Sequence, residues 1–80
     1  MMMKEEEIKE HLISADPEFR RLAEEHKFYE MQLRQLSSRH HMKEQDHVEE
    51  VRLKKKKLQI KDQMNSMIQK YRNELSHQHT

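Results

Sequence analysis

The sequence predicts an all-α protein: an antiparallel helical hairpin with a broken first arm that assembles into a helical bundle. The 80 residues hold no glycine and one proline, and Glu, Lys, Gln, Leu and Met, which favour long helices, are abundant. Strands are not expected, because valine and isoleucine never alternate with polar residues over a useful length. Two segments repeat their apolar residues with helical spacing instead. A chain of this length forms one small domain, residues 1–80.

The first arm is expected to begin with a short amphipathic helix over residues 3–13. Glutamates occupy its first turns, where the helix dipole favours negative charge. Asp16 then suits the N-cap of a new helix and Pro17 suits its first position. Because a proline disfavours helical geometry in the residue before it, the arm should break at Pro17.

The second helix, expected over residues 17–37, carries a strict seven-residue repeat. Its seam steps alternately by three and four residues, through Phe19, Leu22, His26, Tyr29, Leu33 and Leu36. Such a seam is typical of a helix packed lengthwise against another. The periodicity is lost over residues 38–45, which we expect to form a loop.

A long third helix is expected over residues 46–76, followed by a frayed tail at 77–80. Asp46 with Glu49 resembles a capping box at its start. Its stripe comprises Leu53, Lys57, Ile60, Met64, Met67, Ile68, Tyr71 and Leu75. The short loop makes the two long helices antiparallel neighbours, so Leu53, Ile60, Met64, Met67 and Tyr71 should form the facing seam. Ile8 and Leu12 should then lie towards its C-terminal end.

Composition and charge limit the classes of function. The formal net charge is +1, with −2 on residues 1–40 and +3 on residues 41–80, which favours two packed helices over a nucleic-acid binder. Cysteine is absent, which excludes disulfides and thiol chemistry. No apolar run is long enough for a signal peptide or a membrane span. We therefore expect a cytoplasmic protein that does not enter membranes.

Four consecutive lysines within RLKKKKLQIKD (residues 52–62) raise the question of a nucleic-acid site. Successive residues on a helix point ~100° apart, so the run fans around nearly the whole circumference. The lysines that share one side are Lys54, Lys57 and Lys61. They could contact phosphates, or equally Glu25 and Glu30 across the hairpin. No aromatic residues interleave with them and no DNA-binding motif is present, so we interpret the run as a solvated or partner-facing surface.

Catalytic and metal sites find little support in the sequence. A two-helix hairpin offers no dry cavity, and no nucleophile elbow or phosphate-binding glycine loop is present, so we expect no enzyme and no cofactor. Histidines cluster at His40, His41 and His47, but a structural zinc site needs four converging ligands, normally including cysteine, so no metal is expected. His26 could act as a pH switch, although a hydrogen-bonded imidazole at the core edge is the favoured interpretation.

The chain resembles the YdcH-like family of small bacterial proteins of unknown function over residues 8–70. The resemblance rests on DPEFRRLAEEHKFYEMQL and, more specifically, on VRLKKKKLQIKDQM. The matching positions are Phe19, Leu22, Glu25, His26, Tyr29 and Leu33, then Leu53, Lys54, Lys55, Lys57, Leu58, Ile60, Lys61 and Asp62. The chain departs at Tyr29, where an aliphatic residue is usual, and at Phe28 and Met31, where the family is generally polar. The resemblance implies a cytoplasmic helical hairpin with no assigned activity.

A second set of apolar residues suggests an interaction surface. Val51 and Leu58 point away from Ile60, and Phe28 and Met31 point away from Leu33, so one hairpin cannot bury both stripes. We therefore expect a non-enzymatic interaction or structural module that forms a homo-oligomer, with a dimer favoured, or docks on a protein partner through these four residues. The alternative is a nucleic-acid-associated accessory protein that uses Lys54, Lys57 and Lys61.

Overall fold

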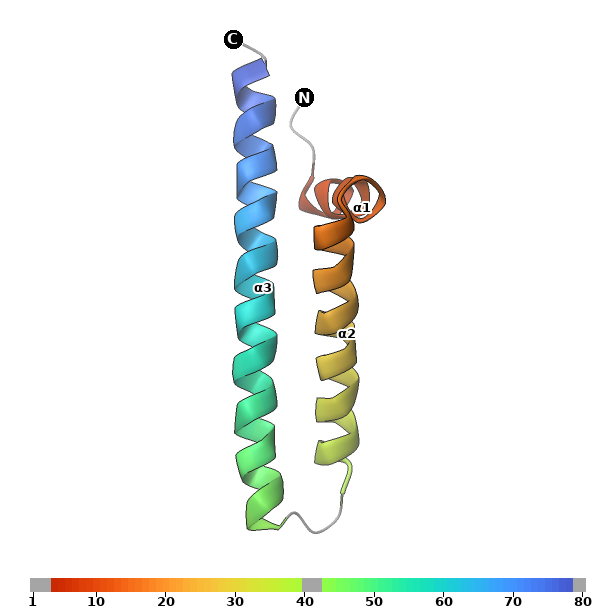
Figure 1. Ribbon diagram of the computed structural model, residues 1–80, viewed down its shortest axis with the longest axis vertical. Coiled ribbons are helices and arrows are strands. Elements are labelled where there is room, and N and C mark those ends of the chain that lie inside the picture. The colour runs from red at the N-terminus through yellow and green to blue at the C-terminus, as the bar shows by residue number, and fades with distance from the viewer. Residues whose placement is uncertain (1–3, 40–42, 79–80) are drawn as a thin grey trace.

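The computed structural model describes residues 4–39 and 43–78, and this part of the chain forms three helices and no strand. The helices are α1 (Glu5–Ala15), α2 (Pro17–Ser37) and α3 (Glu44–Gln78). α2 and α3 lie side by side and run in opposite directions, while α1 lies across the start of α2 and beside the C-terminal half of α3 (Figure 1). The predicted all-α fold class is confirmed for the described residues.

One residue, Asp16, joins α1 to α2. Its backbone is extended (φ −119°, ψ 108°), as expected before Pro17. Its amide donates to the carbonyl of Leu12 at 2.8 Å and so closes the last turn of α1. Its carboxylate accepts hydrogen bonds from the amides of Glu18 (3.0 Å) and Phe19 (3.3 Å), which have no partner within the helix. Asp16 therefore ends one helix and caps the next.

Three helix ends differ from those expected. α1 continues past residue 13 to Ala15, and Ser14 Oγ donates to the carbonyl of Glu10 at 3.2 Å within this last stretch. α3 begins at Glu44 and ends at Gln78, two residues beyond the expected range at either end. Nothing in residues 77 and 78 is a strong helix breaker, so the helix continues. The expected beginning at residue 3 and the last two residues of the tail lie outside the described residues.

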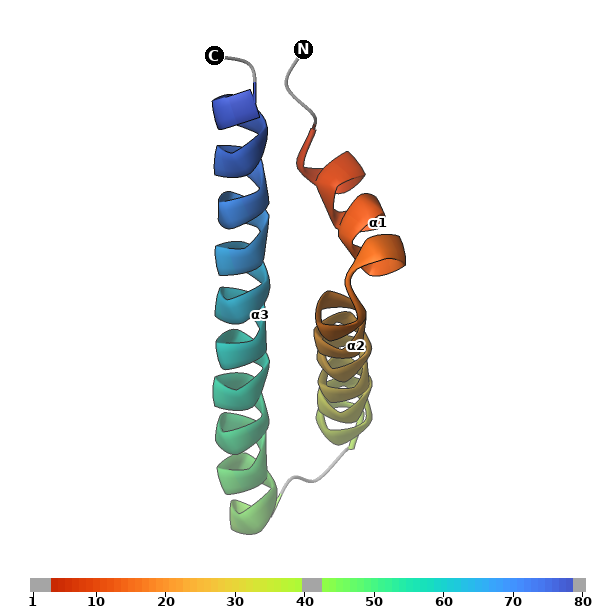
Figure 2. The ribbon, with the colours of Figure 1, turned by 45° about the horizontal axis from the view of Figure 1, so that its top comes forward.

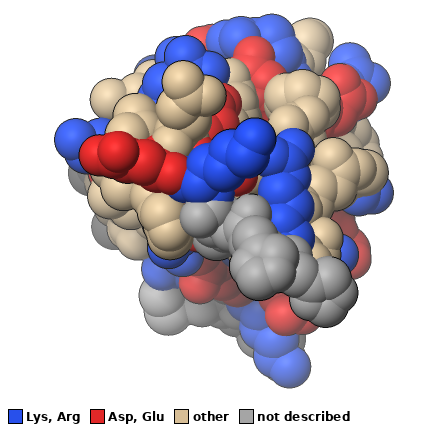
Figure 3. Space-filling model, turned by 90° about the horizontal axis from the view of Figure 1, so that it is seen from below, with Lys and Arg blue, Asp and Glu red and all other residues tan. Residues whose placement is uncertain are grey.

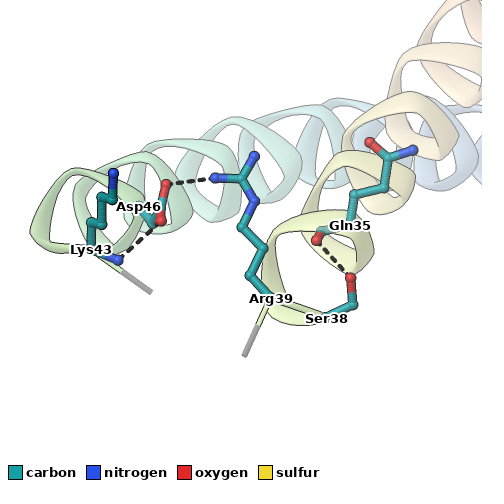
Figure 4. Close-up of polar contacts among 5 residues, drawn as sticks. All are labelled: Gln35, Ser38, Arg39, Lys43 and Asp46. Atoms are coloured by element: carbon teal, nitrogen blue, oxygen red, sulfur yellow. Dashed lines mark hydrogen bonds and ion pairs between the residues drawn. The ribbon is translucent and has the colours of Figure 1, made fainter. Parts of the chain in front are cut away.

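Asp46 stabilises the start of α3, but it is not the N-cap residue that the sequence suggested. It lies in the first turn, and its Oδ2 accepts a hydrogen bond from the amide of Lys43 at 3.0 Å (Figure 4). The amide of Asp46 donates in return to the carbonyl of Lys43 at 2.9 Å. This is the second half of a capping box, in which a carboxylate three residues into the helix reaches back to the residue before it. Glu49 pairs with Arg52 instead.

The tightest packing lies where all three helices meet. Four buried side chains form one cluster there: Ile8, Leu12, Phe19 and Ile68. Met64, Met67 and Tyr71 pack against it and are partly buried. Figure 2 shows α1 and α2 together on one side of α3, so that the first arm covers one face of α3 along most of its length. Neither α1 nor α2 covers the opposite face of α3, and these are the other helices among the described residues.

Candidate functional site

The seam of α2 is buried to different depths along the hairpin. Phe19 and Leu22 are buried at the three-helix end and Leu36 is buried near the loop, whereas His26, Tyr29 and Leu33 between them are only half-buried. Two helices alone can cover one stripe of each other, so seam residues in the two-helix part keep one edge exposed. The middle of the hairpin is therefore the least protected part of the packed interface.

The facing seam of α3 shows the same gradation. Leu53 and Ile60 are buried, and Met64, Met67 and Tyr71 are half-buried. Ile68, another aliphatic residue of the stripe near the three-helix end, is 2% exposed. The ring of Tyr71 stacks on the ring of His11 in α1, with centroids 5.0 Å apart. The sequence predicted that Ile8 and Leu12 lie towards this end of α3, but it gave no indication of the contact between His11 and Tyr71.

His26 lies in the half-buried middle of the seam, among charges from all three helices. Burial lowers the pKa of its imidazole from the ordinary value of 6.5, and Lys57 on α3 adds to that effect. Glu30 on α2 opposes the shift, while Lys61 on α3 and Lys9 on α1 lower the pKa further. The neutral imidazole is therefore the form that the folded protein favours. Lys9 could not have been found as a neighbour from the sequence, because its approach depends on the direction of α1.

The lysine run points around α3 as its helical spacing requires. Lys54 Nζ lies 3.2 Å from Glu50 on its own helix, and Lys57 Nζ lies 3.9 Å from Glu30 across the hairpin. Lys55 and Lys56 are exposed on other sides of the helix. The trio proposed for phosphate contact therefore has two of its three ammonium groups beside a carboxylate. At the loop end of the molecule, basic and acidic side chains are interspersed (Figure 3).

The four candidate interface residues are all exposed: Phe28 by 55%, Met31 by 52%, Val51 by 51% and Leu58 by 58%. They do not form one continuous patch on a single hairpin. Phe28 lines an open groove with Lys56, on one side of the seam, whereas Glu30 contacts Lys57 on the other side. Leu58 lies ~160° around α3 from Lys56 and therefore points away from that groove.

The consequence is two separate apolar surfaces. Val51 and Leu58 lie on the face of α3 that points away from α2, and Met31 lies on the far face of α2. The helical spacing within each helix gave these directions correctly. The relative rotation of the two helices depends on contacts between them, such as Lys57 with Glu30, that the sequence alone did not specify.

The structure offers few features of a chemical site. Within residues 4–39 and 43–78, no group of three or more His, Cys, Asp or Glu is placed to hold a metal ion. His40 and His41, two of the histidines considered as ligands, lie outside the described residues, and His47 is exposed. None of the helices described has the length and apolar content needed to span a bilayer.

Comparison with known proteins supports the resemblance seen in the sequence. A family model described as Protein of unknown function (DUF465) matches residues 19–68, which include the seam of α2, the loop and most of α3. No curated protein and no solved structure gave a significant match. The YdcH-like proteins belong to the family matched, so the resemblance is confirmed. With well over half of its length covered, the chain belongs to the DUF465 family of proteins of unknown function.

Proposed function

We propose that this protein is a non-enzymatic helical interaction module that self-associates, as a dimer, through helix faces that its own hairpin leaves uncovered. The observation that carries the proposal is the exposure of Val51 and Leu58 on the outer face of α3, which no other helix of the described chain covers. Exposed apolar side chains aligned on one helix face commonly mark an association surface.

The small size of the core supports association. Eight hydrophobic side chains are buried in the described part of the chain, and only one end of the molecule has three helices around them. A small domain gains little stability from a single core, and disulfides, a metal or oligomerisation are common additional sources of stability. The sequence has no cysteine, and the described residues contain no group of side chains that could hold a metal ion. We therefore assign the additional stability to oligomerisation.

Sedimentation equilibrium at tens of micromolar tests the proposal. The wild type should sediment as a dimer, and the double variant Val51→Glu with Leu58→Glu should shift towards the monomer while its far-ultraviolet circular dichroism stays helical. Gln63→Glu is the matched control, because it adds a carboxylate at an exposed position of α3 that lies ~140° around the helix from Leu58. A monomeric wild type would contradict the proposal.

The alternative, a nucleic-acid-associated protein, draws on the lysines near His26. Lys57 and Lys61 from α3 and Lys9 from α1 are close enough to lower its pKa together. Pairing of Lys54 with Glu50 and of Lys57 with Glu30 weakens this candidate, because those carboxylates would repel phosphates. Retention on immobilised DNA or RNA that falls steeply with salt would favour it over self-association.

A further inference from the structure

The outer face of α3 carries a stripe of exposed residues that steps alternately by three and four positions. We call it the outer stripe, and it comprises Val48, Val51, Lys55, Leu58, Asp62, Asn65 and Gln69. The apolar members are 67%, 51% and 58% exposed, in chain order. α1 and α2 lie on the other side of α3 in both ribbon views (Figures 1 and 2). The spacing is that of a helix seam that has no partner in this chain.

We propose that a second copy of this chain covers the outer stripe, with its own α3 antiparallel to the first and with Leu58 beside the two-fold axis. This inference rests on the proposed self-association and names the surface that carries it. A two-fold contact brings the same stripe from both copies together. Each charged residue of the stripe must therefore face a residue of opposite charge on the stripe of the second copy.

The charges of the stripe complement themselves in one antiparallel register. Lys55 and Asp62 are both exposed, and neither joins an ion pair within the described residues. A two-fold axis midway between residues 58 and 59 places Lys55 opposite Asp62 of the second copy. Symmetry repeats the pair, so each contact contains two Lys–Asp pairs, one on each side of the two Leu58 side chains.

Other arrangements of the same stripe bring like charges together. A parallel pair would set Lys55 against Lys55 and Asp62 against Asp62 of the second copy. An antiparallel pair shifted so that Val51 meets Leu58 would centre the contact on residues 54 and 55. Lys55 of each copy would then lie beside the two-fold axis, close to Lys55 of the other copy. Since like charges across an interface disfavour binding, Lys55 disfavours both of these arrangements, and the register centred on Leu58 fits the charges best.

Charge reversal tests the pairing. Lys55→Glu and Asp62→Lys should each weaken the dimer by about tenfold, because each replaces two attractions with two repulsions. The double variant with both changes should recover the wild-type dissociation constant. Lys56→Glu is the matched control: it changes the charge equally at the next position, but that side chain points towards the groove with Tyr29. Sedimentation equilibrium measures all four, and circular dichroism verifies that each variant is folded.

Disulfide cross-linking tests the orientation, since the chain contains no cysteine of its own. Leu58→Cys should form a covalent dimer under mild oxidation. Val48→Cys should not, because two copies of residue 48 would lie about 30 Å apart along antiparallel helices. Cross-linking through Val48→Cys, or a wild-type dimer that neither charge reversal weakens, would overturn this inference and leave the proposed self-association standing. A monomeric wild type would overturn both.

Discussion

Arg39, two residues beyond α2, forms an ion pair with Asp46 in the first turn of α3, with 2.9 Å between Arg39 Nη1 and Asp46 Oδ1 (Figure 4). The other carboxylate oxygen of Asp46 accepts the hydrogen bond from the amide of Lys43. The Asp46 side chain is 17% exposed, and that of Arg39 is 59% exposed. One carboxylate therefore both caps a helix and holds the two arms together near the loop.

Replacing the two partners should have unequal effects. Asp46→Ala should cost ~0.5–2 kcal/mol of unfolding free energy, because it leaves a first-turn amide without its cap and also removes the ion pair. Arg39→Ala should cost at most ~1 kcal/mol, since it removes only a largely exposed ion pair. Urea denaturation of both variants measures the difference. Equal losses would show that the cap of α3 does not depend on Asp46.

The Asp16 cap should matter locally. Asp16→Ala removes the acceptor for the amides of Glu18 and Phe19 and should cost ~0.5–2 kcal/mol. Hydrogen exchange should accelerate around residues 16–20, while the amides of Leu53–Met67 stay protected. Asp16→Asn, which keeps an acceptor oxygen, is the control and should lose less. Uniform acceleration along the chain, Leu53–Met67 included, would show that all three helices unfold as one unit.

Acidification should weaken the fold through His26. Because its folded pKa lies below the ordinary 6.5, the unfolded chain binds this proton more readily. The free energy of unfolding should therefore fall as the pH drops through 6.5 towards the lower folded value. His26→Gln should reduce the loss of Tm between about pH 7.5 and about pH 5.5 relative to the wild type. An identical loss in both proteins would assign the pH dependence to other groups.

The core should be most sensitive where the three helices meet. Phe19 is fully buried, so Phe19→Ala should cost ~3–5 kcal/mol by leaving a cavity among Ile8, Leu12 and Ile68. Lys56→Gln, an exposed change, should alter stability by no more than ~0.5 kcal/mol. Thermal melts followed by circular dichroism compare them. A greater loss for Lys56→Gln would contradict this assignment of the core.

Local signals in the sequence predicted local structure well. Asp16 followed by Pro17 specified the junction between α1 and α2, because an N-cap and a first-turn proline act on neighbouring residues only. Asp46 shows where such a signal becomes ambiguous. A carboxylate can accept a hydrogen bond from an unpaired amide at the helix N-terminus either from the N-cap position or from three residues inside the helix. An acidic residue near a helix start is consistent with both positions.

Contacts between helices were harder to predict. Each helix alone fixes the angle between its own side chains, so Leu58 was correctly placed opposite Ile60. Whether Phe28 shares a face with Leu58 depends on how α2 is rotated against α3, and that rotation arises from packing along the seam. The stacking of His11 on Tyr71 needs the direction of α1 as well. The candidate surface could therefore be predicted residue by residue, but its division into two could not.

The position of Ile8 against Ile68 has a consequence for how the chain folds. α2 and α3 are neighbours in sequence, so their pairing can grow outwards from the loop with short closures. Packing of Ile8 against Ile68 joins residues that are 60 positions apart in the sequence. This packing becomes favourable only once the C-terminal end of α3 lies beside Phe19. We expect Ile8→Ala to speed unfolding and leave the folding rate almost unchanged in stopped-flow experiments. α1 would thus dock last, closing the end of a hairpin that is already formed.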